Sequence, residues 1–213
     1  MAEGKTKEGY TVRRICSNHH HSTKFPPVES RVFCHKNNLK WIDMILATLC
    51  YVKHNGKTLM VHRNKKPDDI HEGKWNGLGG KFESGETPEE CVIREVLEES
   101  GLAIRNPKLC GLLMFPKFKG NDWHVFVFTA TEFTGELTES SPEGKLEWID
   151  DDKLTSLNLW ESDHIFFPWI AAGKFFSAKF EYEGDVMRGY EVNFHWCPCH
   201  CEEERSDDEA ISH

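Results

Sequence analysis

Three glutamates in residues 80–102, GKFESGETPEECVIREVLEESGL, have the spacing of a metal site on one side of a helix. Glu95, Glu98 and Glu99 stand at positions i, i+3 and i+4, so in a helix their carboxylates share one face. Like charges that lie together repel each other and do not stabilise a helix. A hard divalent cation such as Mg²⁺ would reverse this effect, because it prefers oxygen ligands and binds carboxylates together with substrate phosphates.

The residues around these glutamates predict the helix itself. Thr87 suits the N-cap, and Glu90 three residues later completes a capping box. Gly101 favours the end of the helix. Val92 and Val96 share another face, which can anchor the helix to a core.

The loop before the helix is suited to close contact with a ligand. Gly80, Ser84 and Gly85 form a tight loop that can bring backbone groups near a phosphate or a metal ion. An acidic helix face in solvent is the competing interpretation, and it accounts well for Glu89 and Glu90. It does not account for the complete spacing of the segment.

The segment resembles the Nudix box at every fixed position of that motif. The resemblance implies an α/β fold, the Nudix fold, in which an α/β/α sandwich surrounds a mixed β-sheet. It also implies metal-assisted attack of water on a phosphoanhydride. The matching residues are Gly80, Glu86, Arg94, Glu95, Val96, Glu98, Glu99, Gly101 and Leu102.

The same resemblance assigns metal and catalytic roles. It implies that Glu95, Glu98 and Glu99 bind Mg²⁺, or Mn²⁺ as an alternative, with the Gly80 carbonyl nearby. Glu98 and Glu99 thereby also count as catalytic residues. Glu143 matches a loop glutamate that in relatives approaches the metal or acts as the base. A loop acid in solvent is an equally good interpretation of Glu143.

Two basic residues complete the expected catalytic end. Arg94 is expected to pair with Glu86 and to hold the loop against the helix. Lys81 follows the first glycine of the box, and the resemblance implies that it contacts the substrate.

Beyond the box, residues 44–195 resemble the MutT group of Nudix hydrolases, whose eukaryotic members hydrolyse oxidised purine nucleoside triphosphates. Asn76, in GKWNGLGGK, falls where the group uses an asparagine against the purine. Trp160 matches its stacking tryptophan, and Asp163 matches the second of two acidic residues that read the base. Ser162 stands where the first acidic residue is expected, which puts the range of accepted bases in question. The implied products are a nucleoside monophosphate and pyrophosphate.

The chemistry of these side chains is consistent with a base pocket. A purine needs a flat apolar face and a few polar groups at its edge. Trp160 offers the face, and Asn76 can both donate and accept hydrogen bonds. A protonated Asp163 carboxyl would donate to a keto oxygen. The competing interpretation is that Trp160 only plugs a helix end, as Trp75, Trp148 and Trp169 are expected to be core residues.

Composition and charge limit the other functional classes to which the protein could belong. The net charge of −9 argues against a nucleic-acid polymer as the main partner, whereas a small polyanion bridged by metal is compatible. No stretch is apolar enough for a membrane span, and the N-terminus has no secretory h-region. The 8 cysteines are then expected to be reduced thiols in the cytoplasm. We expect a monomer or a homodimer that binds a small nucleotide.

The chain is expected to hold one domain with two extensions. Residues 1–40 lack periodicity and predict a poorly ordered extension, so that Met44 is a candidate native start. Residues 41–195 would form the Nudix domain, and 196–213 a disordered tail. Neither extension has ordinary zinc-site spacing, although both carry clusters of potential ligands, Cys16, His19, His20, His21 and Cys34 in the first and Cys197, Cys199, His200 and Cys201 in the second.

Periodicity and turn residues predict the elements of the domain. Strands are expected at 44–53, 58–63, 108–118, 123–133, 146–149, 175–182 and 189–194. Residues 151–156 predict a helical turn, and 161–172 predict a second helix that Gly173 ends.

Two other functions remain open at this point. One is hydrolysis of a different diphosphate, such as a dinucleoside polyphosphate or a nucleotide sugar. The other is a non-catalytic nucleotide sensor on the same fold. Intact Glu95, Glu98 and Glu99 argue against a sensor, which has no need to keep them.

Overall fold

The structure is a computed structural model that describes residues 44–65, 70–139 and 141–195. The predictions for 1–40 and 196–213, including both clusters of cysteines and histidines, lie outside the described residues.

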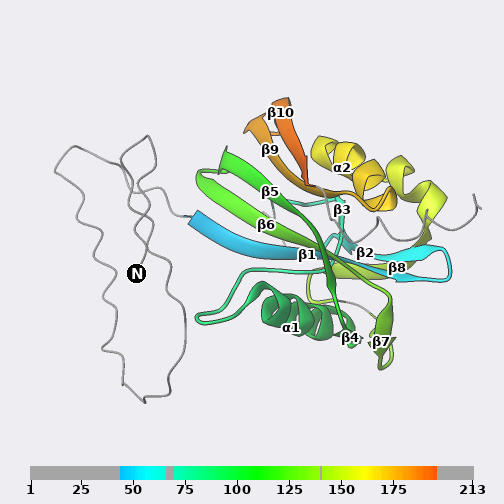
Figure 1. Cartoon of the computed structure of the whole chain (residues 1–213). Coiled ribbons are helices and arrows are strands. Elements are labelled where there is room, and N and C mark those ends of the chain that lie inside the picture. The colour runs from blue at the N-terminus through cyan, green and yellow to red at the C-terminus, as the bar shows by residue number, and fades with distance from the viewer. Residues whose placement is uncertain (1–43, 66–69, 140, 196–213) are drawn as a thin grey trace, which may run out of the picture. The chain divides into compact units, whose positions relative to one another are not determined.

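An eight-stranded sheet forms the centre of the domain (Figure 1). Its order is β10-β9-β5-β6-β1-β2-β3, and β8 also pairs with β2. The β1–β6 and β5–β9 pairs are parallel and the other pairs are antiparallel, so the sheet is mixed as predicted. The strands are β1 (Met44–His54), β2 (Lys57–Arg63), β3 (Trp75–Asn76), β5 (Lys108–Phe118), β6 (Asn121–Ala130), β8 (Gly144–Asp150), β9 (Phe175–Glu183) and β10 (Val186–His195).

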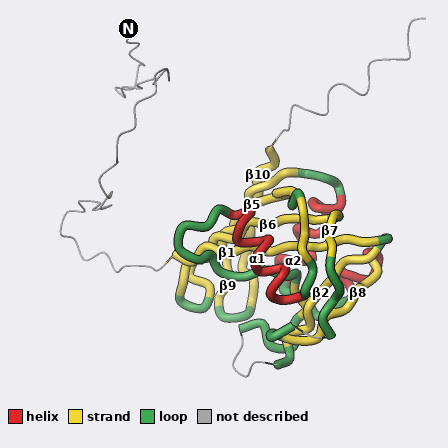
Figure 2. Tube along the Cα trace, turned by 90° about the horizontal axis from the view of Figure 1, so that it is seen from below, coloured by secondary structure: helices red, strands yellow, loops and turns green. Residues whose placement is uncertain are grey.

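Two helices cover opposite faces of this sheet, which confirms the predicted α/β/α sandwich. Figure 1 shows α1 (Pro88–Ser100) below the sheet and α2 (Glu161–Ala171) above it. Figure 2, seen from below, shows α1 lying across the strands. The predicted helical turn is the 3-10 helix η1 (Asp151–Ser156).

Local sequence explains where α1 begins and ends. The Thr87 hydroxyl accepts a hydrogen bond from the Glu90 amide at 3.2 Å, and the Glu90 carboxylate accepts one from the Thr87 amide at 2.8 Å. This capping box was predicted. Gly101 ends the helix at φ 76°, a conformation that glycine adopts without strain. Val92 and Val96 are fully buried and fix the helix to the sheet.

The second core lies between the sheet and α2. Phe166 and Phe167 of α2 pack with Phe176 and Phe180 of β9 and with Met60 of β2. Because each face of the sheet is buried against its own helix, the strands carry apolar residues on both sides.

One predicted strand was wrong in extent. Residues 123–133 do not form a single strand, because β6 ends at Ala130 and the chain then leaves the large sheet. Glu132–Thr134 instead forms β7, which pairs antiparallel with β4 (Ala103–Arg105) in a separate two-stranded sheet. The short strand β3 inside the glycine-rich approach to α1 was not predicted either.

The expected core residues are confirmed within the described chain. Trp75, Trp148 and Trp169 are partly buried and pack against the two cores. Cys50, Cys91 and Cys110 are buried free thiols, and burial raises the pKa of Cys91 to about 11. In the part of the chain that the structure describes, neither helix has the length and apolar character needed to cross a membrane.

Candidate active site

A cavity of about 720 Å³ extends from the start of α2 to the glycine-rich loop before α1. It is lined by residues of β1, β2, β3, β5 and β6, by the start of α2 and by Tyr182 of β9. Eight of the residues singled out from the sequence line it, namely Asn76, Gly80, Lys81, Glu95, Glu143, Trp160, Ser162 and Asp163. Segments far apart in the sequence therefore form one site.

Trp160 lies at the apolar end of the cavity. Its indole N–H donates to His71 Nδ1 at 2.8 Å, so the acceptor nitrogen carries no proton. The rings of Phe118 and Tyr182 meet the indole edge-on, with centroids at 5.3 and 5.7 Å. Lys74 Nζ lies 5.1 Å from the centroid of the indole. These contacts hold the ring in one orientation.

Asp163 and Asn76 supply polar groups at the same end. Asp163 is 7% exposed, and burial raises the pKa of its carboxyl to about 7. The Trp160 backbone, the Ser162 hydroxyl and the charge of Lys74 act in the opposite direction and are weaker. Asn76 is held by the pairing of β3 with Val61 of β2. The carboxyl thus carries a proton for much of the time near neutral pH.

Two of the box glutamates meet the glycine loop, and of these Glu95 also lines the cavity. A Cβ at Gly80 would lie 2.5 Å from the carboxylate of Glu95, so only glycine allows this approach. The Gly79 amide donates to Glu99 Oε2 at 2.9 Å, and Glu99 is 5% exposed. The backbone at 79–80 and these two carboxylates therefore form one polar wall.

Arg94 connects this wall to the loop, and the predicted pairing with Glu86 is present. Its guanidinium donates to Glu86 at 2.6 and 2.9 Å and to the Lys81 carbonyl at 3.1 Å. It also donates to Glu95 at 2.8 Å and to Glu98 at 3.3 Å. The hydrogen bonds from Arg94 lower the pKa of Glu86 to about 2. Arg94 thus holds loop, helix and carboxylates together.

The donor set fits a hard divalent cation in its chemistry. Glu95, Glu98, Glu99 and the Gly80 carbonyl all offer oxygen, which Mg²⁺ and Mn²⁺ prefer. The Gly80 carbonyl accepts from the Thr48 amide at 2.8 Å and has a longer contact, 3.8 Å, from the Cys91 thiol. Across the described ranges, however, no three His, Cys, Asp or Glu side chains converge as a ready metal cluster. Glu98 points outward with 59% of its side chain exposed, and the Arg94 guanidinium bridges it to Glu95.

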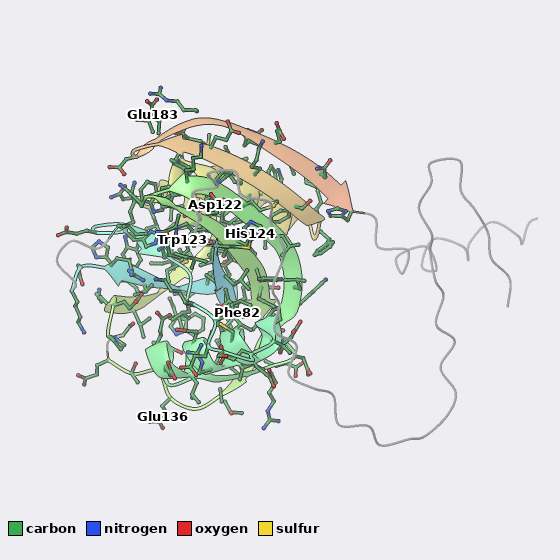
Figure 3. The ribbon with its side chains drawn as sticks, turned by 90° about the vertical axis from the view of Figure 1, so that its left-hand side faces the viewer. Phe82, Asp122, Trp123, His124, Glu136 and Glu183 are labelled. Carbon is green, nitrogen blue, oxygen red and sulfur yellow. The ribbon has the colours of Figure 1, made fainter. Side chains whose placement is uncertain are left out.

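Glu143 and Lys81 line the same cavity. Glu143 precedes β8 and forms an ion pair with Arg63, whose strand β2 runs beside β8. Lys81 Nζ lies 5.3 Å from the centroid of Trp123. Figure 3 labels Trp123 on β6, and Phe82, which follows Lys81, contacts Phe126 of the same strand at 5.5 Å between centroids.

Sequence reasoning missed several residues of the cavity. His71, Phe118, Trp123, Tyr182 and Arg63 line it without having been singled out. The aromatic residues occur in strand-like segments, where the alternation of sides was visible but the partner strands were not. Their convergence depends on the register of β5, β6 and β9, which no local pattern encodes.

Known proteins resemble this chain in sequence. The family model described as "NUDIX domain" matches residues 45–170. The chain is 37% identical over 145 residues to a Danio rerio protein named "Oxidized purine nucleoside triphosphate hydrolase", covering 67% of this chain and 90% of that protein. A Mus musculus protein of the same name is 36% identical over 123 residues, covering 56% of this chain and 78% of that protein.

A solved structure supports the fold assignment. The MutT protein from Bacillus halodurans superposes with a TM-score of 0.63 at 33% identity, covering 70% of this chain and 97% of that one.

Proposed function

The chain belongs to the Nudix hydrolase family, and from that premise we propose that it hydrolyses oxidised purine nucleoside triphosphates such as 8-oxo-dGTP to a monophosphate and pyrophosphate. The observation that carries this proposal is the cavity that joins the apolar end around Trp160 to the polar wall around Gly80 and Glu95. Such a cavity suits a molecule with a flat base at one end and phosphates at the other. The names of the Danio and Mus relatives support the same substrate class.

The pocket end would bind the base. Trp160 offers an aromatic surface held by His71 and Phe118, and Asn76 reads an edge with its amide. Asp163 in its protonated form donates to a keto oxygen of the purine. Lys81, exposed at the mouth, meets the phosphates.

The carboxylate wall would carry out hydrolysis. Glu95, Glu98, Glu99 and the Gly80 carbonyl would hold Mg²⁺, or Mn²⁺, which when bound would supply charge neutralisation for the leaving pyrophosphate and a lowered pKa for the attacking water. Arg94 holds the carboxylates and the loop in position through its hydrogen bonds to Glu86.

Glu143 is our candidate for the base. It lines the cavity, and Arg63 forms an ion pair with its carboxylate. A carboxylate held in this way can accept the proton of the attacking water. We also propose that the enzyme works on the soluble nucleotide pool of the cytoplasm, because its substrates are small polyanions rather than a polymer.

A substrate panel with product analysis tests the function. The wild-type protein and Glu98→Gln are incubated with Mg²⁺ and 8-oxo-dGTP, dGTP, dCTP, a dinucleoside polyphosphate or a nucleotide sugar, and pyrophosphate and phosphate are measured separately. We expect pyrophosphate release with the highest kcat/KM on an oxidised purine triphosphate, and little turnover by the variant. A clear preference for the dinucleoside polyphosphate or the nucleotide sugar would replace this proposal.

A further inference from the structure

Three side chains at the apolar end of the cavity form a continuous hydrogen-bonded chain. Tyr182 of β9 contacts Ser162, and Ser162 contacts its neighbour Asp163. All three line the cavity, and Ser162 and Asp163 are 1% and 7% exposed. The chain joins β9 to the first turn of α2, so it is formed by tertiary structure and not by local sequence alone.

The chemistry of the donors fixes the direction of this chain. The Ser162 amide can only donate, and it donates to the Tyr182 hydroxyl oxygen at 3.0 Å. The single proton of Tyr182 then goes to Ser162 Oγ, also at 3.0 Å. Ser162 is left with its own proton, which it directs to Asp163 Oδ1 at 3.4 Å, a long and weak contact. Each hydrogen bond in the chain is therefore donated in the direction from Tyr182 through Ser162 to Asp163.

This direction distinguishes the two oxygens of the Asp163 carboxyl. Oδ1 faces the Ser162 proton and acts as an acceptor, so a proton bound by the carboxyl belongs on Oδ2. We propose that Tyr182 is a positioning residue for base selection, because through Ser162 it fixes which oxygen of Asp163 donates to the purine and which does not. The inference rests on the proposed function of this cavity and adds a residue and a direction to it.

The other charged and titratable groups around Asp163 do not orient its carboxyl through Ser162. Lys74 acts on the carboxyl through its charge, and Tyr51 faces it from β1. Glu161 lies close enough to influence Tyr182. Burial raises the pKa of both tyrosine hydroxyls, so each keeps its proton over the working range of pH. Within this set only Tyr182 is hydrogen-bonded to Ser162.

The test compares binding of two bases by variants that remove one hydroxyl each. Tyr182→Phe keeps the ring that packs on Phe118 and Trp160 and removes only the donor. Dissociation constants for 8-oxo-dGMP and dGMP are measured by quenching of tryptophan fluorescence at pH 6, 7 and 8, and KM and kcat are measured for the triphosphates. Tyr190→Phe, on the exposed strand β10, is the matched control.

We expect Tyr182→Phe to change the ratio of the two dissociation constants by about tenfold, the typical effect of one oriented hydrogen bond. The change should appear in KM more than in kcat. The ratio of the two dissociation constants should also depend on pH in a different way from that of the wild type. Ser162→Ala should give the same change, and the double variant no more than either single one, because all three break one chain. Tyr190→Phe should leave the ratio as it is in the wild type.

Two results overturn the inference. One is an unchanged ratio in a folded Tyr182→Phe protein, and the other is an additive double variant. Should Tyr182→Phe fail to fold, Ser162→Ala alone decides, with an unchanged ratio counting against the inference. A wild-type protein without any preference between the two nucleotides would instead refute the proposed function, so the two failures can be told apart.

Discussion

The ionisation of Asp163 is coupled to folding. Its pKa is about 7 in the folded chain against an ordinary value of 3.8. Below pH 4 both states hold the proton, so the shift costs nothing. Between pH 4 and 7 the unfolded chain releases a proton that the folded chain retains, and the free energy of unfolding falls by about 1.4 kcal/mol per pH unit.

Asp163→Asn should remove this dependence. The amide keeps the shape of the carboxyl but does not ionise, so the variant should gain stability relative to the wild type as pH rises from 5 to 8. Urea denaturation at both pH values measures the difference, with Asp152→Asn on exposed η1 as the control. Wild-type and Asp163→Asn stabilities that vary in parallel with pH would contradict the assignment.

Trp160→Ala should weaken binding of the base. Stacking on an aromatic ring is worth roughly 1–3 kcal/mol per base, so KM for purine triphosphates should rise by about one to two orders of magnitude. Trp160→Phe should lose much less, since it keeps an aromatic face. Steady-state kinetics on the substrate panel measure both, and an unchanged KM for the alanine variant would place the base elsewhere.

Glu98→Gln should keep the fold and lose turnover. The side chain is mostly exposed, so stability should change little, whereas an anionic ligand is removed. We expect kcat to fall by at least the roughly 10- to 100-fold seen for groups that support metal ligands. Glu89→Gln, an exposed residue in the first turn of the same helix, is the matched control. Equal kcat at saturating Mg²⁺ would exclude Glu98 from the site.

At the level of elements, the polar wall depends on how closely the glycine loop approaches α1. Gly80→Ala would place a Cβ 2.5 Å from the Glu95 carboxyl, so loop and carboxylate must separate. We expect a large loss of kcat with a measurable loss of thermal stability. Gly189→Ala on β10 meets no atom within 4 Å and should affect neither quantity. Full activity of Gly80→Ala would show that the contact has no role.

The elements were predicted to different degrees for physical reasons. α1 was correct because Thr87, Glu90 and Gly101 encode its ends within the helix itself. β7 was missed because its partner is β4, and nothing in residues 123–133 marks where the chain leaves the large sheet. The candidate site follows the same rule. Residues of the box were predictable from spacing, whereas Tyr182 and Phe118 reach the cavity only through strand pairing.

For the whole molecule, the described elements predict that residues 44–195 are sufficient. Every strand of the sheet and every residue proposed for the site lies within this range. A chain of 44–195 should therefore unfold cooperatively and retain the kcat/KM of the full-length protein. Circular dichroism and the pyrophosphate assay measure this, and an unfolded or inactive product would show that residues 1–43 or 196–213 contribute.

The parallel pairing of β1 with β6 has a consequence for synthesis on the ribosome. Of the described strands β1 is made first, yet its parallel neighbour β6 ends only at Ala130, and β5 pairs with β9, which begins at Phe175. Until then the hairpin of β1 and β2 exposes Leu59, Met60 and Val61, which are fully buried in the finished fold. Such non-local pairing slows folding and prolongs the exposure of apolar strands. The nascent chain is therefore expected to depend on chaperones until β9 has left the exit tunnel.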